Sequence, residues 1–201
     1  MYPDPEEVGL SHEKDIHMHG EEARIQMRKE KEESMAEQSI PPKMYLGHVH
    51  LKVANLERAL TFYLEVMGFE LVCTIGTMAF VSAGGYHHRI GLNTWESKDG
   101  SPPARGTTGL YHFALNYPTR RDLAVAYKRI LDHGWFIDGS ADHTSHQALY
   151  LHDPDENGIE LAWDRDPSYW KSWYGITAAD INRLNSPIDF DDLLAEIEKP
   201  S

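Results

Sequence analysis

Two stretches of this 201-residue chain repeat the same pattern of strands and helix at a fixed spacing. Sixty-four residues separate His48 from His112, and the same number separates two helix-capping candidates, Asn55 and Thr119. A histidine and a helix start that keep one register in both stretches indicate a duplicated unit. We therefore expect two similar modules that form the structured part of the chain.

Each module is predicted as a strand, a helix and three further strands, which makes the fold class α+β. In the first module, alternating apolar and polar residues indicate a strand at 44–53. Apolar residues then recur at helical spacing as far as Gly68, which supplies a helix stop. Three short strands are expected to follow, around 70–75, 78–82 and 88–94.

The second module begins with a strand that contains His112. Thr119 and Asp122 predict a capping box, the helix that follows ends at Gly134, and the segment GIELAW closes the module as a strand. The two modules are expected at about 44–95 and 109–166. Together they make one domain at 43–166.

The flanking segments are expected to differ from this domain. Residues 1–42 are rich in charged side chains and predict a mobile or partly helical tail, and no role is assigned to its histidines, His12, His17 and His19. Residues 167–201 predict an extension with a short helix in DDLLAEIE. The extension also holds an aromatic cluster, which either covers the mouth of a pocket or packs against a second subunit: Tyr169, Trp170, Trp173 and Tyr174.

The composition of the chain narrows the classes of partner that it is expected to bind. A formal net charge of -13 argues against nucleic acid or an anionic membrane as the main partner, so a small-molecule substrate is expected. Cys73 is the only cysteine, which excludes an intrachain disulfide and a cysteine-based zinc site and fits the reducing cytoplasm. We see neither a secretory signal in the first residues nor a run of about 20 apolar residues that would span a membrane.

The repeat also predicts a candidate metal site. Aligning the closing segments HRIGLN and GIELAW by their shared Ile-x-Leu places Glu160 opposite Gly91. Repeated modules commonly pack about a pseudo-twofold axis, which would bring His48, His112 and Glu160 to one cleft. Two imidazoles and one carboxylate bind a single divalent metal and leave coordination positions free, the arrangement associated with Fe(II) oxygenases.

Three segments carry a resemblance to a known family: GHVHLKVANLERALTFYLEVMGFEL, GLYHFALNYP and ALYLHDPDENGIELAWD. They resemble the vicinal oxygen chelate superfamily, and within it the catechol 2,3-dioxygenase branch of the type I extradiol dioxygenases. The likeness runs from about Tyr45 to Asp166. It implies two paired βαβββ modules in a partly closed, barrel-like sheet around a metal. It also implies His48, in preference to His50, as the first ligand, with His112 and Glu160 as the others.

The resemblance further implies residues that assist the metal. Tyr150 lies ten residues before Glu160, as does the family tyrosine that hydrogen-bonds to substrate. His143 matches a family histidine that moves protons, with His146 as an alternative. A second pair of neighbouring histidines offers a similar choice. His88 falls near the family histidine that acts beside bound O2. His87 is its competitor.

The function implied is an Fe(II)-dependent extradiol dioxygenase that cleaves a catechol-type aromatic with O2, with Mn2+ as a possible metal and a role in the degradation of aromatic compounds. One alternative is a metal-dependent isomerase, epimerase or lyase of the same superfamily, although Gly91 stands where its fourth ligand would lie. Another is a non-catalytic protein that binds small molecules. A homodimer or higher homo-oligomer is expected by analogy.

Overall fold

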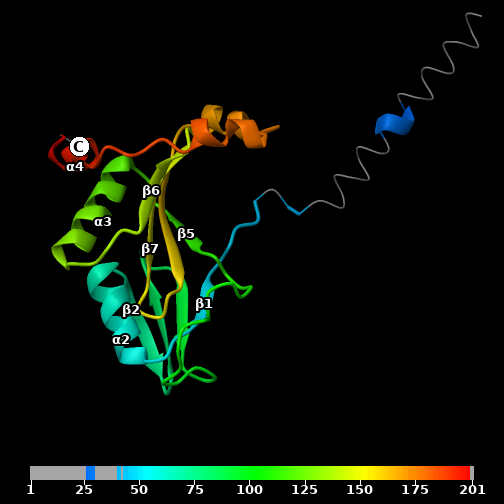
Figure 1. Ribbon diagram of the computed structural model, residues 1–201. Helices are drawn as coiled ribbons and strands as arrows, with labels where there is room; N and C mark the ends of the chain where they lie inside the picture. The colour runs from blue at the N-terminus through cyan, green and yellow to red at the C-terminus, as the bar shows by residue number, and fades with distance from the viewer. Residues whose placement is uncertain (1–25, 30–39, 42, 200–201) are drawn as a thin grey trace, which may run out of the picture. The chain divides into compact units, whose positions relative to one another are not determined.

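The computed structural model describes residues 26–29, 40–41 and 43–199. It divides into two units, Met1–Leu46 and Gly47–Ser201. In the first unit, residues 26–29 are helical. Most of the predicted tail, including its three histidines, lies outside the described residues. All the strands and longer helices named below belong to the second unit, which is drawn in Figure 1 from cyan to red.

The first module forms a four-stranded mixed sheet in the order β1-β4-β3-β2, in which β1 runs parallel to β4. Helix α2 (Leu56–Thr61) follows β1 and continues as a π-helical turn, η1 (Phe62–Val66). The strands agree with the predicted positions, and their bounds are β1 (Val49–Lys52), β2 (Glu70–Ile75), β3 (Met78–Ser82) and β4 (Ile90–Asn93).

The second module repeats this arrangement in the order β5-β8-β7-β6, with β5 parallel to β8. Helix α3 (Arg120–Asp132) follows the first strand, as in the first module. The bounds of the strands are β5 (Phe113–Asn116), β6 (Gly139–Asp142), β7 (His146–His152) and β8 (Gly158–Asp164). Neither sheet closes on itself, so the predicted α+β fold with partly closed sheets is confirmed.

Local capping chemistry sets the helix ends as predicted. The Asn55 side chain accepts a hydrogen bond from the backbone of Arg58, and Thr119 forms a reciprocal capping box with Asp122. Gly68 and Gly134 both follow a helix with positive φ, at 80° and 65°. One detail differs from the prediction, because His48 and His112 each precede their strand by one residue.

Both modules contribute to one hydrophobic core, and in Figure 1 α2 and α3 lie on the same side of the sheets. The turn between β7 and β8 ties the modules together. The buried Asp153 carboxylate accepts a hydrogen bond from the Tyr63 hydroxyl at 2.9 Å. Asp155, also buried, accepts from the Arg58 guanidinium at 2.6 Å and from the Ala54 backbone at 3.0 Å.

The carboxyl-terminal segment packs against the second module. Its backbone pairs with β6, where Asp142 and Ser186 exchange two hydrogen bonds of 2.8 and 3.1 Å. Leu184 and Leu193 are buried. The bounds of its elements are η2 (Pro167–Trp173), η3 (Ala178–Leu184), α4 (Phe190–Ala195) and η4 (Glu196–Glu198). Among the described residues, no helix combines the length and the apolar character that crossing a membrane requires.

Candidate active site

His112 and Glu160 meet at the start of two neighbouring parallel strands. Glu160 lies in β8 opposite Ala114 of β5, and His112 comes two residues before Ala114. The two side chains face each other with Nε2 of His112 2.9 Å from Oε2 of Glu160. Gly158 permits this approach, because a Cβ there would collide with the Tyr111 carbonyl oxygen.

The Glu160 carboxylate is buried, with 8% of the residue exposed, and it is surrounded by histidines. Its other oxygen, Oε1, lies 3.5 Å from Nε2 of His146. Hydrogen bonding from His146 is the main cause that lowers the pKa of Glu160, with further lowering by the nearby His112 and His143, and burial opposes it. Glu160 is therefore an ionised carboxylate at neutral pH.

This donor pair fits two neighbouring positions on one divalent ion. Donors at right angles with bonds of about 2.1 Å lie about 3.0 Å apart, which agrees with the 2.9 Å between His112 and Glu160. A carboxylate and an imidazole are also ligands that Fe(II) accepts. Within residues 26–29, 40–41 and 43–199, however, no three His, Cys, Asp or Glu side chains lie together as an ion-binding group.

His48 lies apart from this pair, at the start of β1 in the first module. Its ring contacts the ring of His88, with centroids 4.5 Å apart, and His88 also packs on Phe80 at 4.6 Å. Burial, followed by the nearby His48, His87 and His50, lowers the pKa of His88. His48 as the third ligand therefore stays a prediction.

The alternative histidines of the first module have separate surroundings. His87 is exposed and contacts His88 through Nδ1 atoms 2.7 Å apart, so one of these nitrogens donates and the other accepts. His50 makes different contacts. Its Nε2 lies 3.0 Å from the Asn93 amide nitrogen, and its ring covers Gly91, where a Cβ would be 2.9 Å from ring carbons.

Tyr150 and His143 form a hydrogen-bonded pair beside Glu160. Tyr150 lies opposite Glu160 on β7, and its hydroxyl is 2.9 Å from Nε2 of His143. Burial, with the Glu160 carboxylate as second cause, raises the pKa of Tyr150 to about 12. Tyr150 is therefore a protonated donor at neutral pH. The His143 and His146 rings contact each other with centroids 4.6 Å apart, so both predicted alternatives belong to this cluster.

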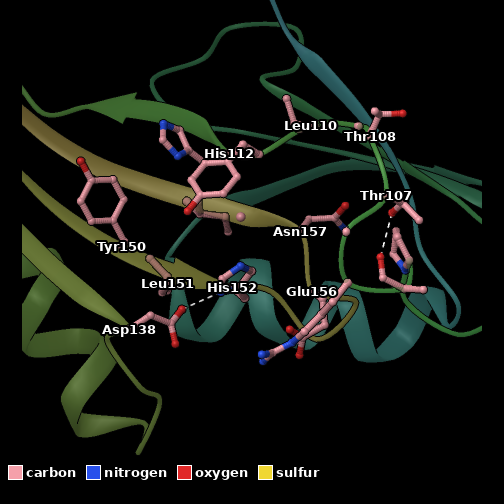
Figure 2. Close-up of a pocket in the computed structure, with 18 of the residues that line it drawn as sticks. Thr107, Thr108, Leu110, His112, Asp138, Tyr150, Leu151, His152, Glu156 and Asn157 are labelled. Atoms are coloured by element: carbon pink, nitrogen blue, oxygen red, sulfur yellow. Dashed lines mark hydrogen bonds and ion pairs between the residues drawn. The ribbon is translucent and has the colours of Figure 1, made fainter. Parts of the chain in front are cut away.

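A cavity of about 690 Å³ opens beside His112 and Tyr150. Their rings lie side by side at one end, with centroids 5.6 Å apart, and Figure 2 shows the loop residues Thr107 and Thr108 at the other end. The size is within the usual range of roughly 300–1,000 Å³ for small-molecule sites. The His112 imidazole and the Tyr150 phenol are thus among the groups presented to a molecule in the cavity.

Two contacts from the carboxyl-terminal segment were not predicted. The Leu184 carbonyl oxygen lies 2.7 Å from Nδ1 of His143. The Trp173 indole N–H donates to the Ser145 hydroxyl, and its ring lies near His143 and His146, at 6.0 and 5.9 Å between centroids. For Trp173 the aromatic cluster was the available signal, while a backbone carbonyl leaves no trace in the sequence.

Comparison with known proteins places this chain in a family. The chain is 40% identical over 134 residues to the catechol-2,3-dioxygenase of Bacillus subtilis strain 168, which covers 66% of this chain and 46% of that protein. It is 32% identical over 121 residues to biphenyl-2,3-diol 1,2-dioxygenase 3 of Rhodococcus globerulus, covering 59% of this chain and 63% of that one. The chain thus spans about half to two thirds of the length of these relatives.

A solved structure supports the fold. The glyoxalase/bleomycin resistance protein/dioxygenase of Alicyclobacillus acidocaldarius superposes with a TM-score of 0.51 at 14% identity, covering 65% of this chain and 98% of that one. The sequence profile of the family itself matches residues 45–161, more than half of the chain and both modules. The chain therefore belongs to the Glyoxalase/Bleomycin resistance protein/Dioxygenase superfamily.

Proposed function

We propose that this protein is an Fe(II)-dependent extradiol dioxygenase that opens the ring of a catechol-type aromatic with O2. The observation that supports this most is the pairing of His112 with Glu160 directly beside the hydrogen-bonded Tyr150 and His143. It brings two groups that can bind a metal next to a pair that can exchange a proton, all in one small cluster. The likeness to proteins named as catechol and biphenyl-diol dioxygenases supports the same reaction.

His112, Glu160 and, by prediction, His48 would hold the metal. When bound there, the ion would bring the two substrate oxygens and O2 together and lower the proton affinity of the substrate hydroxyls. The Glu160 carboxylate would offset part of the positive charge of the ion. The histidines around it keep it ionised in spite of its burial, and its Oε2 faces His112.

The remaining residues of the cluster would handle the substrate and its protons. The cavity beside His112 and Tyr150 would hold the aromatic ring, and the Tyr150 hydroxyl oxygen would accept a hydrogen bond from a substrate hydroxyl. His143, already bonded to Tyr150, would accept a proton from the substrate through it and return the proton later. The reaction needs no other reductant, because both atoms of O2 enter the product as a ring C–C bond breaks.

His88 is proposed to act near O2, in preference to His87. It packs against His48, the predicted ligand, and it is less exposed than His87. Its lowered pKa keeps the imidazole neutral at pH 7. A neutral ring at that position can accept or donate one hydrogen bond without adding a positive charge next to the metal.

The test is turnover by the full-length chain reconstituted with Fe(II) in the absence of air. Given a panel of catechols and then O2, it should form yellow ring-opened products with the consumption of one O2 per substrate. Mn2+ and Zn2+ loaded samples serve as comparisons. Turnover of a substrate without O2 would instead indicate an isomerase or lyase, and no activity on a broad catechol panel would refute the proposed reaction.

A further inference from the structure

The carboxyl-terminal segment 167–186 contacts two of the histidines that lie near Glu160, His143 and His146. This segment follows the stretch that matches the superfamily, which ends at residue 161. In Figure 1 it is drawn mainly in orange, on the opposite side of β6 and β7 from α3. Its two-way backbone pairing with Asp142 and the burial of Leu184 hold it in place. The groups of this segment that contact the histidines are therefore held in fixed positions.

On His143, these contacts decide which ring nitrogen carries the proton. A carbonyl oxygen can only accept, so the Nδ1 atom 2.7 Å from the Leu184 oxygen must carry a hydrogen. A neutral imidazole has one N–H, which leaves Nε2 bare to accept from the Tyr150 hydroxyl at 2.9 Å. The Tyr150 hydrogen then points to His143.

On His146, the contacts favour the opposite arrangement. The Trp173 indole N–H can only donate, so Ser145 accepts from it and keeps its own hydroxyl hydrogen for Nδ1 of His146, 2.9 Å away. The Glu160 oxygen, 3.5 Å from Nε2 of the same ring, can only accept when ionised. Both neighbours are satisfied together when the proton of His146 is on Nε2.

We propose that segment 167–186 holds these two adjacent imidazoles in opposite tautomers, His143 protonated on Nδ1 and His146 protonated on Nε2. Leu184 and Trp173 are then positioning residues, since they act on the site through the histidines. The consequence for chemistry rests on the proposed function: a bare Nε2 on His143 is the atom that exchanges a proton with Tyr150. An N–H on His146 would orient Glu160 so that its other oxygen faces His112.

The tautomers can be measured directly by NMR on the full-length chain labelled with 15N-histidine, because protonated and bare ring nitrogens resonate far apart. A pH of about 8.5 keeps ordinary imidazoles, with a pKa of about 6.5, neutral. The His143→Gln and His146→Gln variants assign the signals. We expect a protonated Nδ1 on His143 and a protonated Nε2 on His146. Finding both rings in the same tautomer would overturn the proposal.

Two variants with matched controls test the role of the segment. Trp173→Phe keeps an aromatic ring but removes the indole N–H, and it should shift the nitrogen signals of His146 while leaving those of His143 in place. Trp170→Phe changes an exposed tryptophan of the same 3-10 helix and should shift neither. Unmoved His146 signals in a folded Trp173→Phe protein would contradict the proposal.

The second variant detaches the segment near Leu184. Ser186→Pro removes the N–H that donates to the Asp142 oxygen at 3.1 Å, whereas Ser186→Ala keeps it. The proline variant should mix the two tautomers of His143, and the alanine variant should not. A His143 signal that stays wholly Nδ1–H after the proline substitution would count against a role for the Leu184 carbonyl.

The rate of turnover gives a second, separate test of the role of the segment. If the protein cleaves catechols, Trp173→Phe should lower kcat roughly 10–100-fold, the usual cost of losing a supporting partner of a metal-site residue, with little change in KM. The tautomer measurement needs no turnover. Expected tautomers without catechol cleavage would therefore refute the proposed function alone, while cleavage with identical tautomers would refute this inference alone.

Discussion

The two modules share strand order and helix placement, yet they carry different side chains at equivalent positions. Glu160 of the second module corresponds to Gly91 of the first, and the neighbouring Ala114 corresponds to His50. In the first module the His50 ring fills the space above Gly91. In the second, the small Ala114 leaves that space to the carboxylate. A duplicated scaffold thus holds the His50 ring in one copy and a buried carboxylate in the other.

The same contrast continues on the next strand. Tyr150 pairs with Glu160 across the second sheet, while Phe80 pairs with Gly91 across the first. The hydroxyl that reaches His143 is therefore missing from the first module, where the Phe80 ring packs on His88 instead. The hydrogen-bonded Tyr150 and His143 and the Glu160 carboxylate thus all belong to the second module. The predicted contribution of the first is one imidazole, His48.

Removing a donor from the second module should have the largest effect. His112→Ala takes away the nitrogen 2.9 Å from Glu160. We expect loss of bound Fe(II) and a fall in kcat/KM beyond the roughly 10–100-fold that follows loss of a supporting residue alone. Metal analysis of protein prepared without air, together with O2 uptake on catechol, measures both.

His133→Ala is the matched control, since His133 is an exposed histidine at the end of α3. It should keep metal and turnover. If His112→Ala retained full metal content, the donor pair would not be the metal site. Undiminished binding of aromatic ligands by a metal-free protein would favour the non-catalytic alternative.

The first module provides the next test, because its ligand is inferred and lies apart from the pair. His48→Ala should lower Fe(II) affinity and turnover almost as much as His112→Ala if both modules supply a donor. His50→Ala changes the histidine two residues along, whose Nε2 bonds to Asn93, and it should keep the metal stoichiometry. Equal metal content in wild type and His48→Ala would confine the site to the second module.

Sequence reasoning succeeded here wherever the signal was local or repeated. The 64-residue register located both helices and their caps, and the aligned closing strands located Glu160. It failed for contacts that neither the repeat nor the family resemblance marks. The Tyr63 to Asp153 hydrogen bond joins residues 90 apart, and no periodicity connects them. The Leu184 carbonyl on His143 is a backbone contact, to which the side chain of Leu184 gives no clue.

The buried Asp153 carboxylate links the modules through its hydrogen bond to Tyr63, so its removal should loosen that link. Besides Tyr63, its carboxylate accepts from the backbone of Asp155 and from the backbone and side chain of Asn157. Asp153→Ala leaves several buried donors without a partner, and we expect a loss of about 3 kcal/mol in the free energy of unfolding. Urea unfolding at pH 7 measures it. A loss below about 1 kcal/mol would mean that the core alone holds the modules together.

The outer strands of the two sheets also differ, and the dependence of stability on pH should reveal this difference. Strand β2 is almost wholly exposed, whereas Asp142 at the end of β6 forms a two-pronged ion pair with Arg165, with both bonds at 2.7 Å. Hydrogen bonding from Arg165, with further help from Thr144 and Gln147, lowers the pKa of Asp142 well below its ordinary value. Its stabilising contribution is therefore complete above the unfolded pKa of about 3.9. It is lost as the pH falls through the folded pKa.

The difference between wild type and Asp142→Asn isolates this carboxylate from others that titrate in acid. Both side chains of the pair are partly exposed, so we expect Asp142→Asn to cost about 1–2 kcal/mol at pH 6. The gap should narrow as the pH is lowered below 4, because the carboxylate of the unfolded wild type then binds a proton while that of the folded protein still keeps its charge. Urea midpoints at several pH values measure it. A gap that stays constant down to pH 2 would exclude the ion pair as its source.

The smallest expected effect is a difference in stability loss between substitutions at two tyrosines. The 64-residue register makes these two, Tyr63 and Tyr127, equivalent. Tyr63 donates to Asp153, and burial together with that carboxylate raises its pKa, which keeps it protonated. Tyr127 instead stacks on Phe190 at 4.9 Å between ring centroids. Tyr63→Phe should therefore cost about 1 kcal/mol, the net value of one buried hydrogen bond, while Tyr127→Phe should cost little because phenylalanine keeps the stack. Equal losses in urea unfolding would mean that ring packing, rather than the bond to Asp153, makes Tyr63 matter.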